Sequence, residues 1–98
     1  MIIYEVNITI NEIVYNEYIE WLNVHIKKML KYDGFIKVEK YEHLNKGLTK
    51  NIIIHYYISS YNKLDNYLKI NSKKMRKDGT DLFKNNIIIK RRILKNIK

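Results

Sequence analysis

The chain contains no cysteine, proline, alanine or glutamine among its 98 residues, and it has only three glycines and one tryptophan. Without cysteine it can form neither disulfide bonds nor thiolate metal sites. We expect a cytoplasmic protein, because a reducing compartment suits such a composition. No apolar run approaches the about 20 residues that a membrane helix needs, so no membrane partner is expected. The opening stretch, MIIYEVNITI, lacks the basic segment of a signal peptide.

Positive charge is in excess: 19 Lys and Arg residues face 10 Asp and Glu residues, which gives a formal net charge of +9. A strongly basic protein is a candidate for nucleic-acid binding. However, Ile, Lys and Asn dominate the composition, Lys greatly outnumbers Arg, and all three favoured residues have AT-rich codons. Compositional drift therefore explains the charge better than selection for a polyanion does.

The first third of the chain predicts a strand followed by a helix. Apolar residues alternate with others along residues 2–10, which indicates a strand with one face in a core. Asn11 is suited to cap the helix that follows. The apolar stripe of this helix consists of Val14, Tyr18, Leu22, Ile26 and Met29. Gly34 is suited to the turn that ends it.

The remaining chain predicts strand, strand, helix and strand. Residues 35–44 mix Lys with Glu, which is typical of an edge strand. Residues 51–59 are nearly all apolar or aromatic and suit a central strand, and residues 45–50 form the hairpin connection before them. The last strand is expected at residues 86–94.

The second helix is expected to begin at Ser59 or Ser60 and to pass through Leu64, Tyr67, Leu68 and Met75. Asp78-Gly79 should weaken this helix, because glycine is a poor helix former.

This order, βαββαβ, predicts a single α+β domain over residues 1–98. With right-handed crossovers it folds as a ferredoxin-like sandwich, a four-stranded antiparallel sheet with two helices on one face. The first and third strands, which are the most apolar, should lie in the middle. The face away from the helices is called the open sheet face here. Its expected residues are Ile3, Glu5, Asn7, Phe35, Lys37, Glu39, Tyr41, Ile53, His55 and Tyr57.

Short matches through the chain point to a family. They are MIIYEVNITI, Trp21-Leu22, Val24-His25-Ile26, Met29-Leu30, Gly34-Phe35, Tyr67, Phe83, and Arg91 with Leu94. On these residues the chain resembles a bacterial family known as domain of unknown function 4286. It departs from the family pattern at Lys27 and Lys73, where members tend to have Pro, and at His55, where they tend to have Gln. The resemblance implies a ferredoxin-like domain similar to dimeric α/β-barrel proteins, whose sheets pack face to face, and it implies no reaction.

Trp21 and His25 lie one helical turn apart and share a face of the first helix. In one interpretation they line a pocket, with His25 as an acid–base group or ligand contact. In the interpretation that we favour, Trp21 packs on the core rim and His25 bonds a nearby carbonyl or carboxylate.

Glu5 and His55 should be neighbours on adjacent strands, with Tyr57 on the same open face. A carboxylate beside an imidazole can create a general base. The two residues can instead form an ion pair at a dimer interface, or they can simply be polar residues on a solvated face, and these non-catalytic interpretations are favoured.

Arg91 and Arg92 follow an apolar run in the last strand, and because strands alternate only one of them can face the open side. That arginine could bind a carboxylate or phosphate through paired hydrogen bonds, or simply discourage aggregation at an edge. The resemblance favours Arg91. The three histidines come from three elements without the close spacing of metal ligands, so we expect neither a metal nor a cofactor.

These observations predict a homodimer joined through the open sheet face, acting as a non-catalytic binding or interaction module. One alternative is a cofactor-free enzyme with a pocket between the first helix and the sheet or across the dimer, holding His25 or His55 beside Arg91. Haem-degrading monooxygenases with this fold need a Trp in the sheet and a His on the second helix. They are a poor match, because Trp21 is expected on the first helix and residues 61–84 contain no histidine.

The other alternative is an RNA- or ribosome-associated protein. An RNA-recognition motif needs glycine in its third strand, whereas NIIIHYYI has none. Glu5 would also repel phosphate, so a nucleic-acid partner is not favoured.

Overall fold

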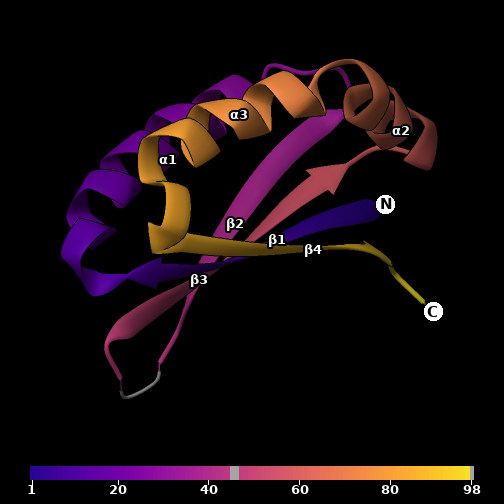
Figure 1. Cartoon of the computed structure of the whole chain (residues 1–98). Coiled ribbons are helices and arrows are strands. Elements are labelled where there is room, and N and C mark those ends of the chain that lie inside the picture. The colour runs from indigo at the N-terminus through magenta and orange to yellow at the C-terminus, as the bar shows by residue number, and fades with distance from the viewer. Residues whose placement is uncertain (45–46, 98) are drawn as a thin grey trace.

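The computed structural model describes residues 1–44 and 47–97 and shows an antiparallel sheet with helices along one side (Figure 1). The strands are β1 (Ile2–Asn11), β2 (Phe35–His43), β3 (Thr49–Ile58) and β4 (Ile87–Lys95). The helices are α1 (Tyr15–Met29), α2 (Tyr61–Ile70) and α3 (Ser72–Phe83), with short 3-10 turns η1 (Glu12–Val14) and η2 (Lys84–Asn86). The predicted hairpin connection at residues 45–50 lies partly outside the described residues.

The sheet has the order β2-β3-β1-β4, with all neighbours antiparallel. This confirms the ferredoxin-like arrangement and the central places of the first and third strands. The charged strands lie at the edges, where Lys and Glu reach solvent and discourage pairing with other chains. No helix in the described part of the chain is long and apolar enough to cross a membrane.

The prediction of two helices was wrong, because the second one is divided at Asn71 into α2 and α3. Asn71 lies between the two segments with φ −115° and ψ −25°, and its N–H closes α2 on the Tyr67 carbonyl. Next to the break, the Ser72 hydroxyl donates to the Leu68 carbonyl at 2.7 Å. Such back-bonding bends helices, and here it accompanies a change of direction between the two segments.

The expected weakening at Asp78-Gly79 was also wrong, since α3 continues through both residues. Gly79 is buried against α1, and a Cβ at this position would lie 2.7 Å from Cη2 of Trp21. The missing side chain therefore makes room for the indole, and the packing of the two helices outweighs the poor helix propensity of glycine.

The core lies between the helices and the sheet and includes the predicted inward residues of β1 and β3, which are Tyr4, Val6, Ile8, Ile54, Tyr56 and Ile58. Phe35 joins this core, which corrects its predicted place on the open sheet face. A bulge between Phe35 and Lys37 inserts one extra residue into β2 and reverses the side on which Phe35 lies. Lys37, Glu39 and Tyr41 keep their predicted side, in register with Tyr57, His55 and Ile53.

Candidate functional site

The six candidate residues divide between the two sides of the sheet. Glu5, His55 and Tyr57 lie on the open sheet face, in β1 and β3. Trp21, His25 and Arg91 instead line a cavity between the helices and the sheet. The two groups therefore form two separate sites.

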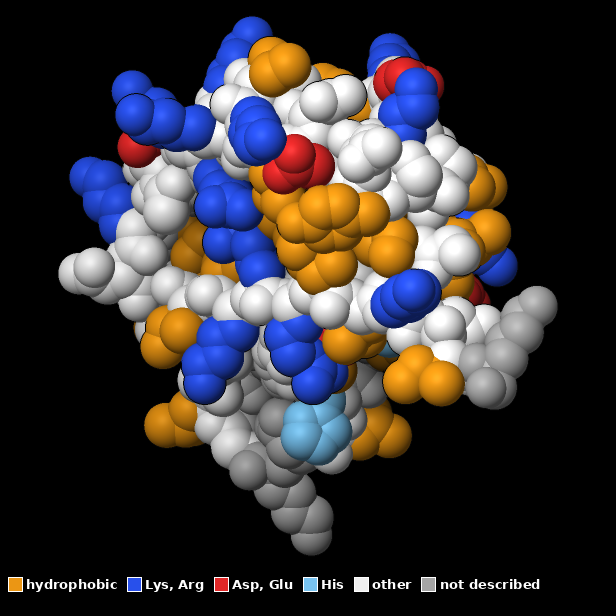
Figure 2. Space-filling model, turned by 90° about the vertical axis from the view of Figure 1, so that its right-hand side faces the viewer, with side chains coloured by type: hydrophobic (Ala, Val, Ile, Leu, Met, Phe, Trp, Pro, Cys, Tyr) orange, Lys and Arg blue, Asp and Glu red, His pale blue; other side chains and the backbone are white. Residues whose placement is uncertain are grey.

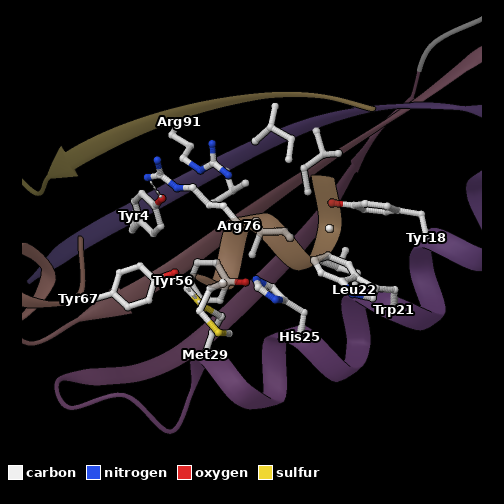
Figure 3. Close-up of a pocket in the computed structure, with 16 residues that line it drawn as sticks. Tyr4, Tyr18, Trp21, Leu22, His25, Met29, Tyr56, Tyr67, Arg76 and Arg91 are labelled. Carbon is white, nitrogen blue, oxygen red and sulfur yellow. Dashed lines mark hydrogen bonds between the residues drawn. The ribbon is translucent and has the colours of Figure 1, made fainter. Parts of the chain in front are cut away.

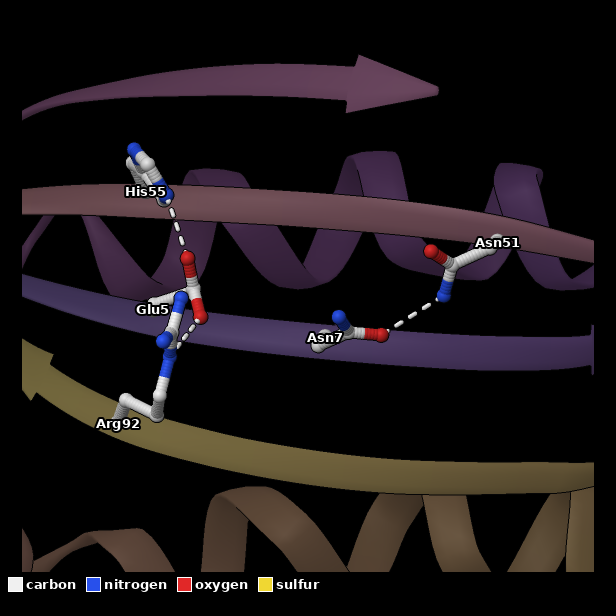
Figure 4. A network of polar contacts seen from close by, with 5 residues as sticks. All are labelled: Glu5, Asn7, Asn51, His55 and Arg92. Atoms are coloured by element: carbon white, nitrogen blue, oxygen red, sulfur yellow. Dashed lines mark hydrogen bonds and ion pairs between the residues drawn. The ribbon is translucent and has the colours of Figure 1, made fainter. Parts of the chain in front are cut away.

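Glu5 lies at the centre of the open sheet face, between His55 and Arg92 on the two neighbouring strands (Figure 4). Nε2 of His55 is 2.9 Å from Oε1 of Glu5, and Nε of Arg92 donates to Oε2 at 2.6 Å. Glu5 is only 5% exposed because these side chains cover it. We call this set of three residues the Glu5 row.

The Glu5 row is poorly suited to proton transfer. The hydrogen bond from Arg92 lowers the pKa of Glu5 below its usual value, the bond from His55 adds to this, and burial opposes it. A general base at neutral pH needs a higher pKa and a free oxygen, whereas both oxygens of Glu5 are already bonded. This arrangement fits a structural ion-pair network better than it fits an acid–base pair.

The surroundings of the Glu5 row are mixed. On one side, a hollow is lined by Ile3, Tyr57 and Leu94 among others, and Lys37 Nζ lies 4.5 Å from the centre of the Tyr57 ring. On the other side, a second hollow includes Asn7 and Asn51, whose side chains bond at 2.7 Å. Neither hollow includes Glu5 or His55. The centre of the face is thus filled rather than concave.

The cavity lies beneath α1 and α3, on the opposite side of the sheet (Figure 3). The cavity has a volume of about 40 Å³, which is room for a few waters or a small ligand. Most of its wall is aromatic or apolar. The aromatic residues that line it are Tyr4, Tyr18, Trp21, Tyr56 and Tyr67.

Trp21 and His25 form one end of the cavity wall, with their rings stacked 4.6 Å apart at 18°. Burial lowers the pKa of His25 to about 4; Asp78 opposes this shift, while Lys28 and Arg91 add to it. His25 is therefore a neutral ring at pH 7. The structure places Trp21 at the core margin, packed on Tyr18, Phe83 and Gly79, and it also brings both rings to the cavity.

Two arginines reach the cavity from different elements, Arg91 from β4 and Arg76 from α3 (Figure 3). Arg76 Nη2 donates to the Tyr4 hydroxyl at 3.1 Å. Arg92, not Arg91, occupies the open sheet face, because Arg91 is paired with the buried Val6 and follows the inward column of β4. Sequence reasoning did not identify Arg76 or Tyr4 as cavity residues. The local sequence of α3 does not show that the side chain of Arg76 reaches Tyr4 in the sheet.

Among residues 1–44 and 47–97, no group of three or more His, Cys, Asp or Glu side chains could hold a metal ion. Figure 2 shows one face of the molecule, where Lys and Arg side chains lie over several parts with apolar side chains exposed between them. On this face the positive charge does not form a single stripe of the kind that follows a nucleic-acid backbone.

Comparison with known proteins finds a family. The family model described as "Domain of unknown function (DUF4286)" matches residues 1–97. No curated protein matches the chain.

Solved structures share the fold at low sequence identity. A variant of SnoaB, a cofactor-independent oxygenase from Streptomyces nogalater, is 7% identical with a TM-score of 0.75, covering 99% of this chain and 94% of its own. A dimeric ferredoxin-like protein from an uncultured marine organism is 12% identical with a TM-score of 0.72, covering 95% and 92%. The de novo designed protein Foldit4 is 11% identical with a TM-score of 0.64, covering 98% of each chain. An oxygenase and a designed protein share this architecture, so the likeness shows the fold alone.

Proposed function

Because the chain belongs to the family described as domain of unknown function 4286, a description that names no reaction, we propose a function from its geometry. The protein is a non-catalytic binding module that forms a homodimer through its open sheet face. The observation that carries this proposal is the Glu5 row. It closes the centre of the open sheet face with paired charges and leaves no concave site there.

The shape of the molecule supports a second copy of this chain as the occupant of that face. The molecule is a slab with principal extents of 37 × 31 × 18 Å, so its broad side offers ample area for the about 800 Å² per partner of a standard interface. Around the Glu5 row lie Ile3, Ile53, Tyr57 and Leu94, each half-buried in the single chain. Packing against the same face of a second copy would remove these apolar groups from water.

A cofactor-free enzyme is the second candidate, favoured by a specific observation. The cavity holds His25 and Arg91 together, which is the pocket that an enzyme of this fold would need. We rank it second because the only imidazole in the cavity wall has a pKa of about 4 and is a weak base at neutral pH. The cavity wall also contains no carboxylate, serine, threonine or cysteine to act as a nucleophile.

Light scattering after size-exclusion chromatography tests the dimer. The wild-type protein should show twice the monomer mass of 12.0 kDa. Tyr57→Glu and Ile53→Arg place charges on the open sheet face and should each yield monomers, because an unpaired charge in a buried interface is strongly unfavourable.

Ile70→Arg provides the matched control. Ile70 is 76% exposed at the end of α2, on the helix side of the sheet, so this variant should remain dimeric. Wild-type protein that stays monomeric at high concentration would overturn the proposed dimer. Dissociation by Ile70→Arg as well would show that the interface lies elsewhere.

A further inference from the structure

We propose that the cavity beneath α1 and α3 binds a small organic carboxylate, held by Arg91 and Arg76. This site lies on the opposite side of the sheet from the Glu5 row, so the inference does not depend on the dimer. The cavity wall supplies cationic donors and an apolar lining, and each of these points to the chemistry of the ligand.

The position of Arg91 is the first step of the argument. On the inward side of β4, residues 87, 89, 91 and 93 follow one another as Ile, Ile, Arg and Ile. Arg91 therefore takes a place in an otherwise apolar column, opposite the buried Val6. Arg91 is half-buried there, so its guanidinium keeps part of its hydration, and an anionic partner would replace the part that is lost.

No such partner comes from the described part of the chain. Among residues 1–44 and 47–97, neither Arg91 nor Arg76 forms an ion pair with a carboxylate. Arg92, one residue along the same strand, is in contrast paired with Glu5. The described lining of the cavity thus has two cationic groups, the half-buried Arg91 and the exposed Arg76, and no anionic one, which favours an anion as its occupant.

Donor geometry favours a carboxylate in particular. A guanidinium presents parallel N–H groups that match the two oxygens of a carboxylate. The Tyr4 hydroxyl accepts a bond from Arg76 and so keeps its own proton as a donor toward the cavity. A cavity of about 40 Å³ admits only a carboxylate with a very short apolar body, such as formate or acetate. The aromatic wall disfavours phosphate, a more strongly hydrated anion that would lose more hydration on entering.

The single tryptophan provides the readout, because Trp21 lines the cavity and no other indole contributes to the fluorescence. We would titrate the full chain with formate, acetate, phosphate and acetamide, following Trp21 emission and checking each result by calorimetry. Acetamide has nearly the shape of acetate but no charge. Formate or acetate should saturate the signal at millimolar concentration or below, and acetate should bind at least about tenfold more tightly than acetamide.

Arg91→Met and Lys90→Met form a matched pair. Both remove one positive charge from β4, but Lys90 is exposed on the open sheet face. Arg91→Met should weaken carboxylate binding at least about tenfold, while Lys90→Met should leave it unchanged. Circular dichroism would verify that both variants fold. If Arg91→Met did not fold, Arg91→Lys would replace it as the test. Lysine keeps the positive charge but lacks the paired N–H donors of the guanidinium, so this variant should still weaken binding.

Several results would overturn the inference. They are no saturable response to formate or acetate up to about 10 mM, equal affinity for acetate and acetamide, tighter binding of phosphate than of either carboxylate, and binding that survives the loss of Arg91. Binding of acetamide alone would leave a neutral-ligand site and reject the carboxylate. None of these results bears on the dimer, which light scattering tests separately.

Discussion

At the scale of single residues, the ionisable groups of this protein show how environment decides a role. Glu5 is buried, yet it remains a stable carboxylate because Arg92 and His55 occupy its oxygens. His25 is half-buried without such a partner, and burial lowers its pKa to about 4, so the ring is neutral at pH 7. Arg91 is half-buried on the inward side of β4, and no carboxylate in the described part of the chain forms an ion pair with it. The proposed carboxylate ligand would supply this partner.

The low pKa of His25 predicts a loss of stability in mild acid. Between the ordinary value of 6.5 and about 4, the unfolded chain takes up a proton at this histidine and the folded chain does not. The free energy of unfolding should therefore fall as the pH falls through this range. The full effect is at most about 3 kcal/mol, and the partial exposure of the ring reduces it.

Urea unfolding at pH 7 and pH 5 measures this effect. Asp78, Lys28 and Arg91 are the charged neighbours that act on the His25 ring. His25→Phe keeps the ring stacked on Trp21 and should remove most of the difference between the two pH values. His43→Phe, at an exposed histidine of β2, should retain it. An NMR titration that placed the His25 pKa near 7 would contradict the prediction and strengthen the enzyme candidate.

At the scale of elements, packing between helices explains features that helix propensity alone does not. Trp21 on α1 meets Gly79 on α3, and Tyr18 and Phe83 add an edge-to-face contact between the same two helices at 4.9 Å. Glycine inside a helix costs about 1 kcal/mol relative to alanine. Glycine is nevertheless favourable at position 79, because any side chain there would displace the indole of Trp21.

Gly79→Ala should therefore destabilise the protein, although alanine is the better helix former. The new Cβ would meet the ring of Trp21 at 2.7 Å, and Trp21 is confined by Tyr18, His25 and Phe83. The expected loss is about 1–3 kcal/mol, as for overpacked cores, measured by thermal or urea unfolding.

Gly47→Ala is the control for this substitution, because a Cβ at Gly47 has no neighbour within 4 Å. It should be neutral or slightly stabilising, since it only restricts the unfolded chain. A Gly79→Ala variant more stable than the wild type would show that the indole has room to shift.

At the scale of the whole molecule, the sheet separates two surfaces with different chemistry. The helix side holds a small cavity with cationic and aromatic walls, and the open side holds the Glu5 row within an apolar surround. A binding module can use both sides at once, with one side for assembly and the other for a ligand.

The proposed dimer predicts that thermal stability depends on concentration. Association stabilises only the folded state, so the thermal midpoint of the wild type should rise as the protein concentration is raised. Differential scanning calorimetry over a hundredfold range of concentration would measure this shift. The Tyr57→Glu variant should have a midpoint that does not change with concentration. A constant midpoint for both proteins would count against the dimer.

Much of the fold was predictable from the sequence, because it rests on local patterns. Alternation along residues 2–10 and the apolar run at residues 51–59 located the two central strands, and the charged strands were correctly assigned to the edges. The family was also recognised from short matches on these elements, and the family comparison confirmed it. The candidate site was predictable only as a set of residue types, with Glu5 beside His55 as its clearest pair.

The sequence by itself therefore determined the order of the strands, the sheet topology and the inward faces of β1 and β3, but not the division of the second helix into α2 and α3. Only the tertiary structure decided which side of the sheet Phe35 and Arg91 face. A bulge reverses Phe35, and three consecutive isoleucines before Lys90 conceal the inward side of β4. The meeting of Arg76, Arg91 and Tyr4 in one cavity depends on three distant segments coming together. Periodicity within one element carries no information about such contacts, because they are set by how the elements pack.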